Sequence, residues 1–138
     1  MAVTATPIFI QSVKMALTAY TTASSTATHI TGGTNGSKIL SLMAVSDSTS
    51  AHIFLVKMST GGTALTIGAA SVTASAGTDG ATASINLLST SVMPGLPLDQ
   101  NGCPYLHVPS TAHTLTVTAS AAINTGKQVT FSSVYGDY

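Results

Sequence analysis

The sequence predicts an all-β chain, an antiparallel β-sandwich or jelly-roll-like domain of about eight strands. Apolar and polar residues alternate with period two along several segments, and no segment shows a helical period. Turn signals built on Gly, Asn and Pro recur between these segments. A length of 138 residues fits one domain, residues 1–138. Aromatic residues are only 5% of the chain, so we expect a lean core of Ile, Leu, Val and Met.

The first predicted strand covers residues 13–20. Its alternation places four apolar side chains on one face: Val13, Met15, Leu17 and Ala19. We interpret the Ser/Thr/Ala run that follows, residues 21–28, as thin β structure, because Thr favours strands and remains compatible with water. Residues 32–36, with the sequence GGTNG, predict a tight hairpin turn, since Gly and Asn accept positive φ.

Central strands are predicted over residues 38–46 and 52–59, where apolar residues occur on both faces. Asp and Ser in the segment 47–50 favour a turn between them. Gly61 and Gly62 mark a further turn, which leads into a strand over residues 64–72.

The second half of the chain begins with a flexible Gly-containing loop over residues 75–80 and a short strand over residues 83–88. Residues 93–106 contain three prolines, which exclude a central strand and predict an ordered, extended loop. Two alternating strands end the chain, over residues 114–120 and 128–134, with a turn between them.

Charge is scarce in this chain. Four Lys and four Asp give a net charge of zero, and the sequence contains neither Arg nor Glu. Nucleic-acid binding depends on clustered Lys and Arg, which this sequence lacks. No apolar run approaches the ~20 residues of a membrane helix. We therefore expect neither a nucleic acid nor a membrane as partner, and because a charge near zero promotes association, we expect a protein that lies against neighbours.

The cysteine and histidine residues do not form a recognisable site. Cys103 is the sole cysteine, and an inert loop residue is the favoured interpretation, ahead of an interchain thiol and of a nucleophile served by His107. The spacing of His107 and His113 allows them to approach each other across a predicted turn at Pro109 and Ser110, but two ligands do not close a zinc site.

The aspartates also lack the arrangement that catalysis requires. Asp47, Asp79 and Asp99 occur in Gly/Ser/Asn turns, where Asp ordinarily caps the backbone. Gly32 and Gly33 begin a Gly-rich stretch that lacks the Lys-Ser/Thr ending of a phosphate loop. We expect no enzyme, no cofactor and no metal.

Several motifs together resemble a known family. They occur in a fixed order: residues 2–11 (AVTATPIFIQ), 31–39 (TGGTNGSKI), the loop within 88–106 with PGLPLD, NG and PYL, then GK at 126–127 and GDY at 136–138. The pattern covers nearly the whole chain and resembles small virion proteins of tailed bacteriophages and phage-like particles. Cys103 departs from it, since a polar residue such as Asn is expected there.

The resemblance implies a β-sandwich capsid decoration protein that binds the outside of the shell and cements neighbouring subunits of the major capsid protein. It implies a homo-oligomer, commonly a trimer, that is made in the bacterial host cytoplasm and carried on the outer capsid surface of the virion.

Two segments are candidates for the contacts with the capsid or with other copies. One is an arm over residues 1–12, and the other is the loop over residues 93–106. The candidate contact residues are Pro7, Ile8, Phe9, Ile10, Pro94, Leu96, Pro97, Leu98 and Tyr105. Prolines in such segments reduce the ordering entropy that binding costs. The alternative for Phe9, Leu96 and Tyr105 is closure of the domain's own core.

Two other functions remain open. A tail or head-fibre adhesin module that recognises a host surface glycan would use exposed aromatic side chains, and the four tyrosines are Tyr20, Tyr105, Tyr135 and Tyr138. The other function is a small hydrolase, whose hydrolytic activity would be lost in the His107→Ala or Cys103→Ala variant. We expect the unmodified chain to have no such activity.

Overall fold

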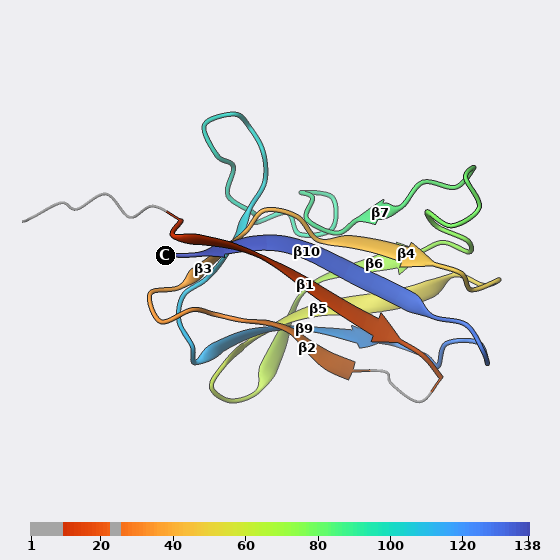
Figure 1. The fold of residues 1–138 in the computed structure, drawn as a ribbon. Helices are drawn as coiled ribbons and strands as arrows, with labels where there is room; N and C mark the ends of the chain where they lie inside the picture. Colours follow the sequence, from red (N-terminus) through yellow and green to blue (C-terminus); the bar gives the residue numbers. More distant parts are fainter. Residues whose placement is uncertain (1–9, 23–25) are drawn as a thin grey trace, which may run out of the picture.

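Two antiparallel sheets stack face to face in the computed structural model, which describes residues 10–22 and 26–138 (Figure 1). The first sheet contains β1 (Ser12–Tyr20), β3 (Ser37–Ile39), β4 (Met43–Ser46), β7 (Ile85–Asn86), β8 (Leu106–Val108) and β10 (Val129–Asp137). The second contains β2 (Thr26–Thr31), β5 (His52–Thr60), β6 (Ala64–Val72) and β9 (His113–Ala119). All pairings between these strands are antiparallel, so the predicted β-sandwich is confirmed.

Strand β10 organises the first sheet. It pairs with β1 along its whole length on one side, from Ser12 opposite Asp137 to Tyr20 opposite Val129. On its other side it pairs with β3 and β4, which pair in turn with the short strands β8 and β7. Strand β1 is therefore an edge, and in Figure 1 it runs beside β10 across the front of the molecule.

The second sheet has the order β2-β9-β5-β6, so β2 and β6 are its edges. Both edges are irregular. The β2–β9 register shifts between Thr28 and Ile30, which leaves His29 as a bulge. The β5–β6 register shifts so that Val56 faces Gly68 and Lys57 faces Thr66, which leaves Ile67 as the extra residue.

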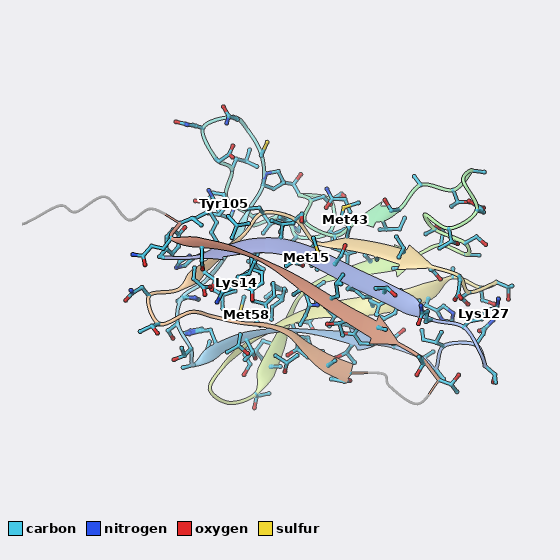
Figure 2. The ribbon with its side chains drawn as sticks, in the orientation of Figure 1. Lys14, Met15, Met43, Met58, Tyr105 and Lys127 are labelled. Carbon is cyan, nitrogen blue, oxygen red and sulfur yellow. The ribbon has the colours of Figure 1, made fainter. Side chains whose placement is uncertain are left out.

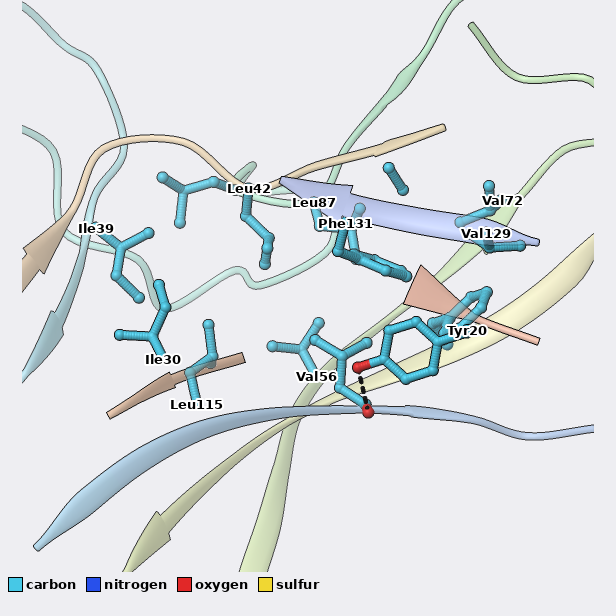
Figure 3. Close-up of a cluster of buried hydrophobic side chains, with 14 of the residues drawn as sticks. Tyr20, Ile30, Ile39, Leu42, Val56, Val72, Leu87, Leu115, Val129 and Phe131 are labelled. Atoms are coloured by element: carbon cyan, nitrogen blue, oxygen red, sulfur yellow. Dashed lines mark hydrogen bonds between the residues drawn. The ribbon is translucent and has the colours of Figure 1, made fainter. Parts of the chain in front are cut away.

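Three aromatic rings occupy the centre of the core, where we expected mainly aliphatic side chains. Tyr20, Phe54 and Phe131 are fully buried and contact one another edge to face, with ring centroids 4.8 to 5.3 Å apart. The Tyr20 hydroxyl donates to the Val117 carbonyl across the sandwich at 2.8 Å (Figure 3). Burial raises the pKa of Tyr20. Aliphatic side chains surround the rings, among them Ile39 and Leu42.

Two predictions for the region before β5 are wrong. The expected strand over residues 38–46 is two strands, β3 and β4, because Leu42 turns into the core and the amides of Leu40 and Ser41 both donate to the Val134 carbonyl. The GGTNG segment is a tight turn with Gly36 at φ +95°, but it is not a hairpin, since β2 and β3 belong to different sheets.

Other elements match the expectation to different degrees. Strand β6 has the predicted bounds, and Gly61 forms the β5–β6 turn at φ +77°. Strand β7 is shorter than predicted, and β8 lies at the end of the Pro-rich segment, where we expected only loop. Strand β2 begins at Thr26, so the interpretation of the Ser/Thr/Ala run as β structure is confirmed for residues 26–28; Thr21 and Thr22 belong to no strand, and residues 23–25 lie outside the described part of the chain.

Candidate contact surface

The outward face of β1 is an exposed apolar surface. Val13, Met15 and Leu17 are 70%, 67% and 67% exposed, and Ala19 is exposed too. We call these four residues the β1 patch. The alternation of the sequence found these residues, but the face that β1 turns toward the core is the other one, which carries Tyr20. On the neighbouring strands the surface continues with half-buried apolar side chains, including Met43 on β4 (Figure 2).

The start of β1 is fixed to the end of β10. Ile10, a candidate contact residue, is half-buried and lies over Gly136, where an added Cβ would come within 2.2 Å of its side chain. Lys14 Nζ forms an ion pair with Asp137, which also accepts a hydrogen bond from Ser37 Oγ at 2.6 Å. The hydrogen bond from Lys14, followed by that from Ser37, lowers the pKa of Asp137. Pro7, Ile8 and Phe9 lie outside the described residues.

The Pro-rich segment forms a projecting hairpin over residues 97–105, which we call the loop hairpin (Figure 1). The Asp99 amide donates to the Cys103 carbonyl, and Asp99 Oδ1 accepts the amides of Asn101 and Cys103 at 2.8 and 2.9 Å. These hydrogen bonds, first that of Cys103 and then that of Asn101, lower the pKa of Asp99. The predicted capping role of Asp99 is confirmed, and the loop is ordered by its own backbone.

Within this segment the candidate residues separate into exposed and buried ones. Leu98 is 55% exposed, and Pro94 and Pro97 are exposed as well. Leu96 is buried in the core cluster, so for this residue the core-packing alternative is correct. Cys103 is an exposed free thiol.

An apolar pocket of about 250 Å³ lies where the loop segment meets β6. Its lining is Ile67, Met93, Gly95, Leu96, Pro97 and Leu106. Met93 is buried and reaches the inner face of β6 at Gly68, where an added Cβ would lie 2.5 Å from its Cγ. The segment therefore closes the sandwich beside β6 and carries Leu98 outward from that base.

Tyr105 lies in a small aromatic and basic cluster at the foot of the loop hairpin. Lys38 Nζ is 4.3 Å from the centroid of the half-buried Tyr105 ring, which is a cation–π distance. The His107 and Tyr138 rings lie 5.7 Å apart beside them. Burial, and then the proximity of Tyr105, raise the pKa of Tyr138.

A wider, polar hollow of about 460 Å³ lies among the connections at the other end of the sandwich, where Figure 2 labels Lys127. Its lining includes Asp47, Thr125 and Gln128, and Asp47 Oδ1 accepts the Gln128 amide at 2.6 Å. Asp47 thus joins the β4–β5 connection to the segment that precedes β10. The tyrosines that the structure describes do not line this hollow.

Two buried histidines, His29 and His52, and the half-buried His113 lie within hydrogen-bond distance of hydroxyl groups. His29 lies between the sheets, with Nδ1 2.8 Å from Thr18 Oγ1 and Nε2 2.7 Å from Ser133 Oγ. Burial lowers its pKa to about 4. His52 Nε2 lies 2.8 Å from Ser48 Oγ, and His113 Nδ1 lies 2.9 Å from Ser110 Oγ.

His107 and His113 have different neighbours, since the His107 ring lies beside Tyr138 and His113 Nδ1 faces Ser110 Oγ. Across residues 10–22 and 26–138, no three His, Cys, Asp or Glu side chains are placed to hold a metal ion. The same part of the chain contains no helix long and apolar enough to cross a membrane.

Comparisons of the chain with protein-family models, with curated proteins and with solved structures found no match. Sequence reasoning selected Leu98 and Ile10 but did not select the β1 patch as contact surface. The alternation of residues 13–20 contained a signal for the β1 patch. Tyr20, the one aromatic residue of the segment, lies on the opposite face, and a large ring is a good candidate for the buried side.

Proposed function

We propose that this chain is a non-enzymatic structural virion protein that decorates the outer capsid surface, binds the major capsid protein and cements neighbouring subunits. The proposal also makes it a homo-oligomer, for which the family resemblance implies a trimer. The observation that carries it is the β1 patch, whose three large apolar side chains are each about two-thirds exposed on one edge strand. Contiguous exposed apolar surface on a small domain marks an interaction site.

Two further observations support the proposal. The loop hairpin presents Leu98 on a backbone that Asp99 already orders, so binding through it costs little conformational entropy. Charged residues are 6% of the chain, so its contacts depend on apolar burial and neutral hydrogen bonds. Many weak contacts of this kind, repeated over a shell, give high avidity.

A glycan-binding adhesin of the tail or head fibre is the second candidate. The observation in its favour is the cluster of Lys38, Tyr105 and Tyr138, which combines half-exposed rings with a cation. The polar hollow offers hydroxyl and amide groups without a tyrosine among the described residues. The two proposals differ in copy number and position on the particle.

Electron microscopy of shells incubated with the purified chain tests the proposal. We expect regular copies over the whole shell, which persist in molar salt because contacts without charge are screened little. A few copies at one vertex or on the tail favour the adhesin, and release in molar salt contradicts the contact chemistry.

A matched pair of variants tests the loop hairpin. Leu98→Asp is expected to lower shell affinity about tenfold or more, since one Leu lost from an interface costs at least ~1.5 kcal/mol. Gln100→Asp adds the same charge to an exposed position of the same hairpin and is expected to bind normally. Equal binding of both variants would remove Leu98 from the contact.

A further inference from the structure

Among residues 10–22 and 26–138, no strand pairs with the outer side of β1, so this edge is open to another strand. Exposed edges invite pairing with other chains, and folded proteins protect them with bulges, proline, charged side chains such as Lys, or very short strands. Of the edges described, β2 and β6 have bulges, and β7 and β8 have two and three residues. Strand β1 has nine residues in unbroken register, with no proline and no bulge.

The free hydrogen-bonding groups of this edge belong to the β1 patch. In an antiparallel ladder, successive residues of a strand direct their N–H and C=O groups to opposite sides. Val134 accepts from Leu40 and donates to Ser41, so its groups point away from β1. Met15 is opposite Val134, and its own groups must therefore point to the open edge. By alternation the same holds for Val13, Leu17 and Ala19.

The charge on β1 does not oppose a second copy. Lys14 is the one charged residue of the strand, and it is paired with Asp137 of the same chain. Asp137 lies on β10, on the side of Lys14 remote from the open edge. Because the chain has no net charge, two copies approach without like-charge repulsion.

We propose that β1 pairs antiparallel with β1 of a second copy, with Ala16 opposite Ala16. This register overlaps all nine residues and places Met15 opposite Leu17 and Val13 opposite Ala19. Directly opposite residues share a face, so on the face of the β1 patch apolar side chains meet apolar side chains. Four hydrogen-bonded residue pairs supply about eight backbone hydrogen bonds, two from each pair.

The pair joins two six-stranded sheets into one and brings the two β1 patches together. It is two-fold, so it makes a dimer in place of the trimer that the resemblance implies. The inference deepens the proposed function by naming the contact between copies, and it rests on that function only for the role of the joined patch as a surface for the shell.

Site-specific disulfide formation tests the register. In a Cys103→Ser background, Ala16→Cys places two thiols in a non-hydrogen-bonded pair, with Cα atoms about 4.5 Å apart, within disulfide range. Ala19→Cys in the same background is the control, because its two thiols would lie about 20 Å apart at the rise of a β-strand. We expect mild oxidation to give a covalent dimer with Ala16→Cys alone. A monomer with Ala16→Cys, or equal cross-linking of both variants, overturns the proposal.

Sedimentation equilibrium without shells tests the same edge by an independent route. The wild-type chain is expected at twice its monomer mass, and Met15→Lys/Leu17→Lys at the monomer mass, because lysines then face each other across the pair. Ile53→Lys/Leu65→Lys adds the same charge at positions 53% and 68% exposed and is expected to stay dimeric. Circular dichroism confirms that each variant is folded. A monomeric wild type, or dissociation of both variants, overturns the proposal.

The outcomes separate this inference from the proposed function. A monomer that still decorates shells regularly contradicts the β1 pairing and the homo-oligomer, and leaves the decoration role in place. A dimer that does not bind shells contradicts only the decoration role.

Discussion

Strands β1 and β6 are both nine-residue edges of this sandwich, yet they end their sheets in different ways. Strand β6 has a bulge at Ile67, and the chain itself covers its inner face with Met93, which packs on Gly68. Strand β1 is regular, is bonded along one side to β10, and exposes Val13, Met15 and Leu17.

The difference shows that the chain covers the inner face of one edge strand itself and, among the described residues, leaves the outward face of the other uncovered. Beside β6, the Pro-rich segment packs its buried side chains, Met93 and Leu96, into the core between the sheets. At β1, large apolar side chains are present without anything in the described chain to cover them. A composition low in charge is consistent with such a surface, because long charged side chains at an interface lose entropy and hydration.

The largest expected effect on stability comes from removing the Met93 side chain, which packs on Gly68 of β6. Met93→Ala removes a buried side chain and should lower the free energy of unfolding by about 2–5 kcal/mol. Met15→Ala, in dilute protein where copies do not pair, should change it by less than about 0.5 kcal/mol, because Met15 is mostly exposed. Urea unfolding of both variants measures the contrast. Similar losses in the free energy of unfolding would show that Met15 on β1 contributes to stability as much as Met93 beside β6.

A pH titration of stability tests the buried His29, which links β1 and β10 through hydrogen bonds. His29 bonds Thr18 of β1 and Ser133 of β10, and burial lowers its pKa from 6.5 to about 4. As pH falls from 6.5 to 4, the unfolded chain binds the proton first, so stability falls by about 3 kcal/mol in total. Above pH 6.5 His29 is neutral in both states and contributes no pH dependence.

Unfolding measured at a series of pH values checks this expectation. His29→Gln should remove most of the slope between pH 6.5 and 4, whereas His107→Gln, at an exposed position, should retain it. Hydrogen exchange at pH 4.5 should accelerate in β1 more than in β6. An unchanged slope in His29→Gln would assign the acid sensitivity to other groups.

The smallest expected effect concerns the ion pair that fixes the start of β1. The hydrogen bond from Lys14 is the first cause of the lowered pKa of Asp137. Lys14→Gln should raise that pKa toward its usual range, while the bond from Ser37 keeps part of the shift. An NMR titration of the Asp137 carboxyl measures it, with Lys57→Gln as the control. Global stability should hardly change, since Lys14 is exposed to solvent.

Period-two patterns predicted the fold class and most strands, because alternation is a local property of the sequence. The same patterns did not show which face of residues 13–20 is buried. That choice depends on Tyr20, whose hydroxyl finds its acceptor on Val117, 97 residues away. The sequence pattern predicted β3 and β4 as one strand for a related reason. The break between them depends on hydrogen bonds from the Leu40 and Ser41 amides to the carbonyl of Val134, which lies far along the chain in β10.

The candidate site was predicted in part. The Pro-rich segment was identified from its prolines and glycines, and the cap by Asp99 follows from its place before Asn101 and Gly102. Sequence alone did not separate buried Leu96 from exposed Leu98, two residues apart, because their difference depends on the pocket beside β6.

A three-dimensional reconstruction of a particle that carries this chain tests the central claim most directly. The account predicts regular copies on the outer shell, with Val13, Met15 and Leu17 covered by neighbouring protein and Leu98 in contact with the shell. Copies whose β1 patch faces solvent would contradict it.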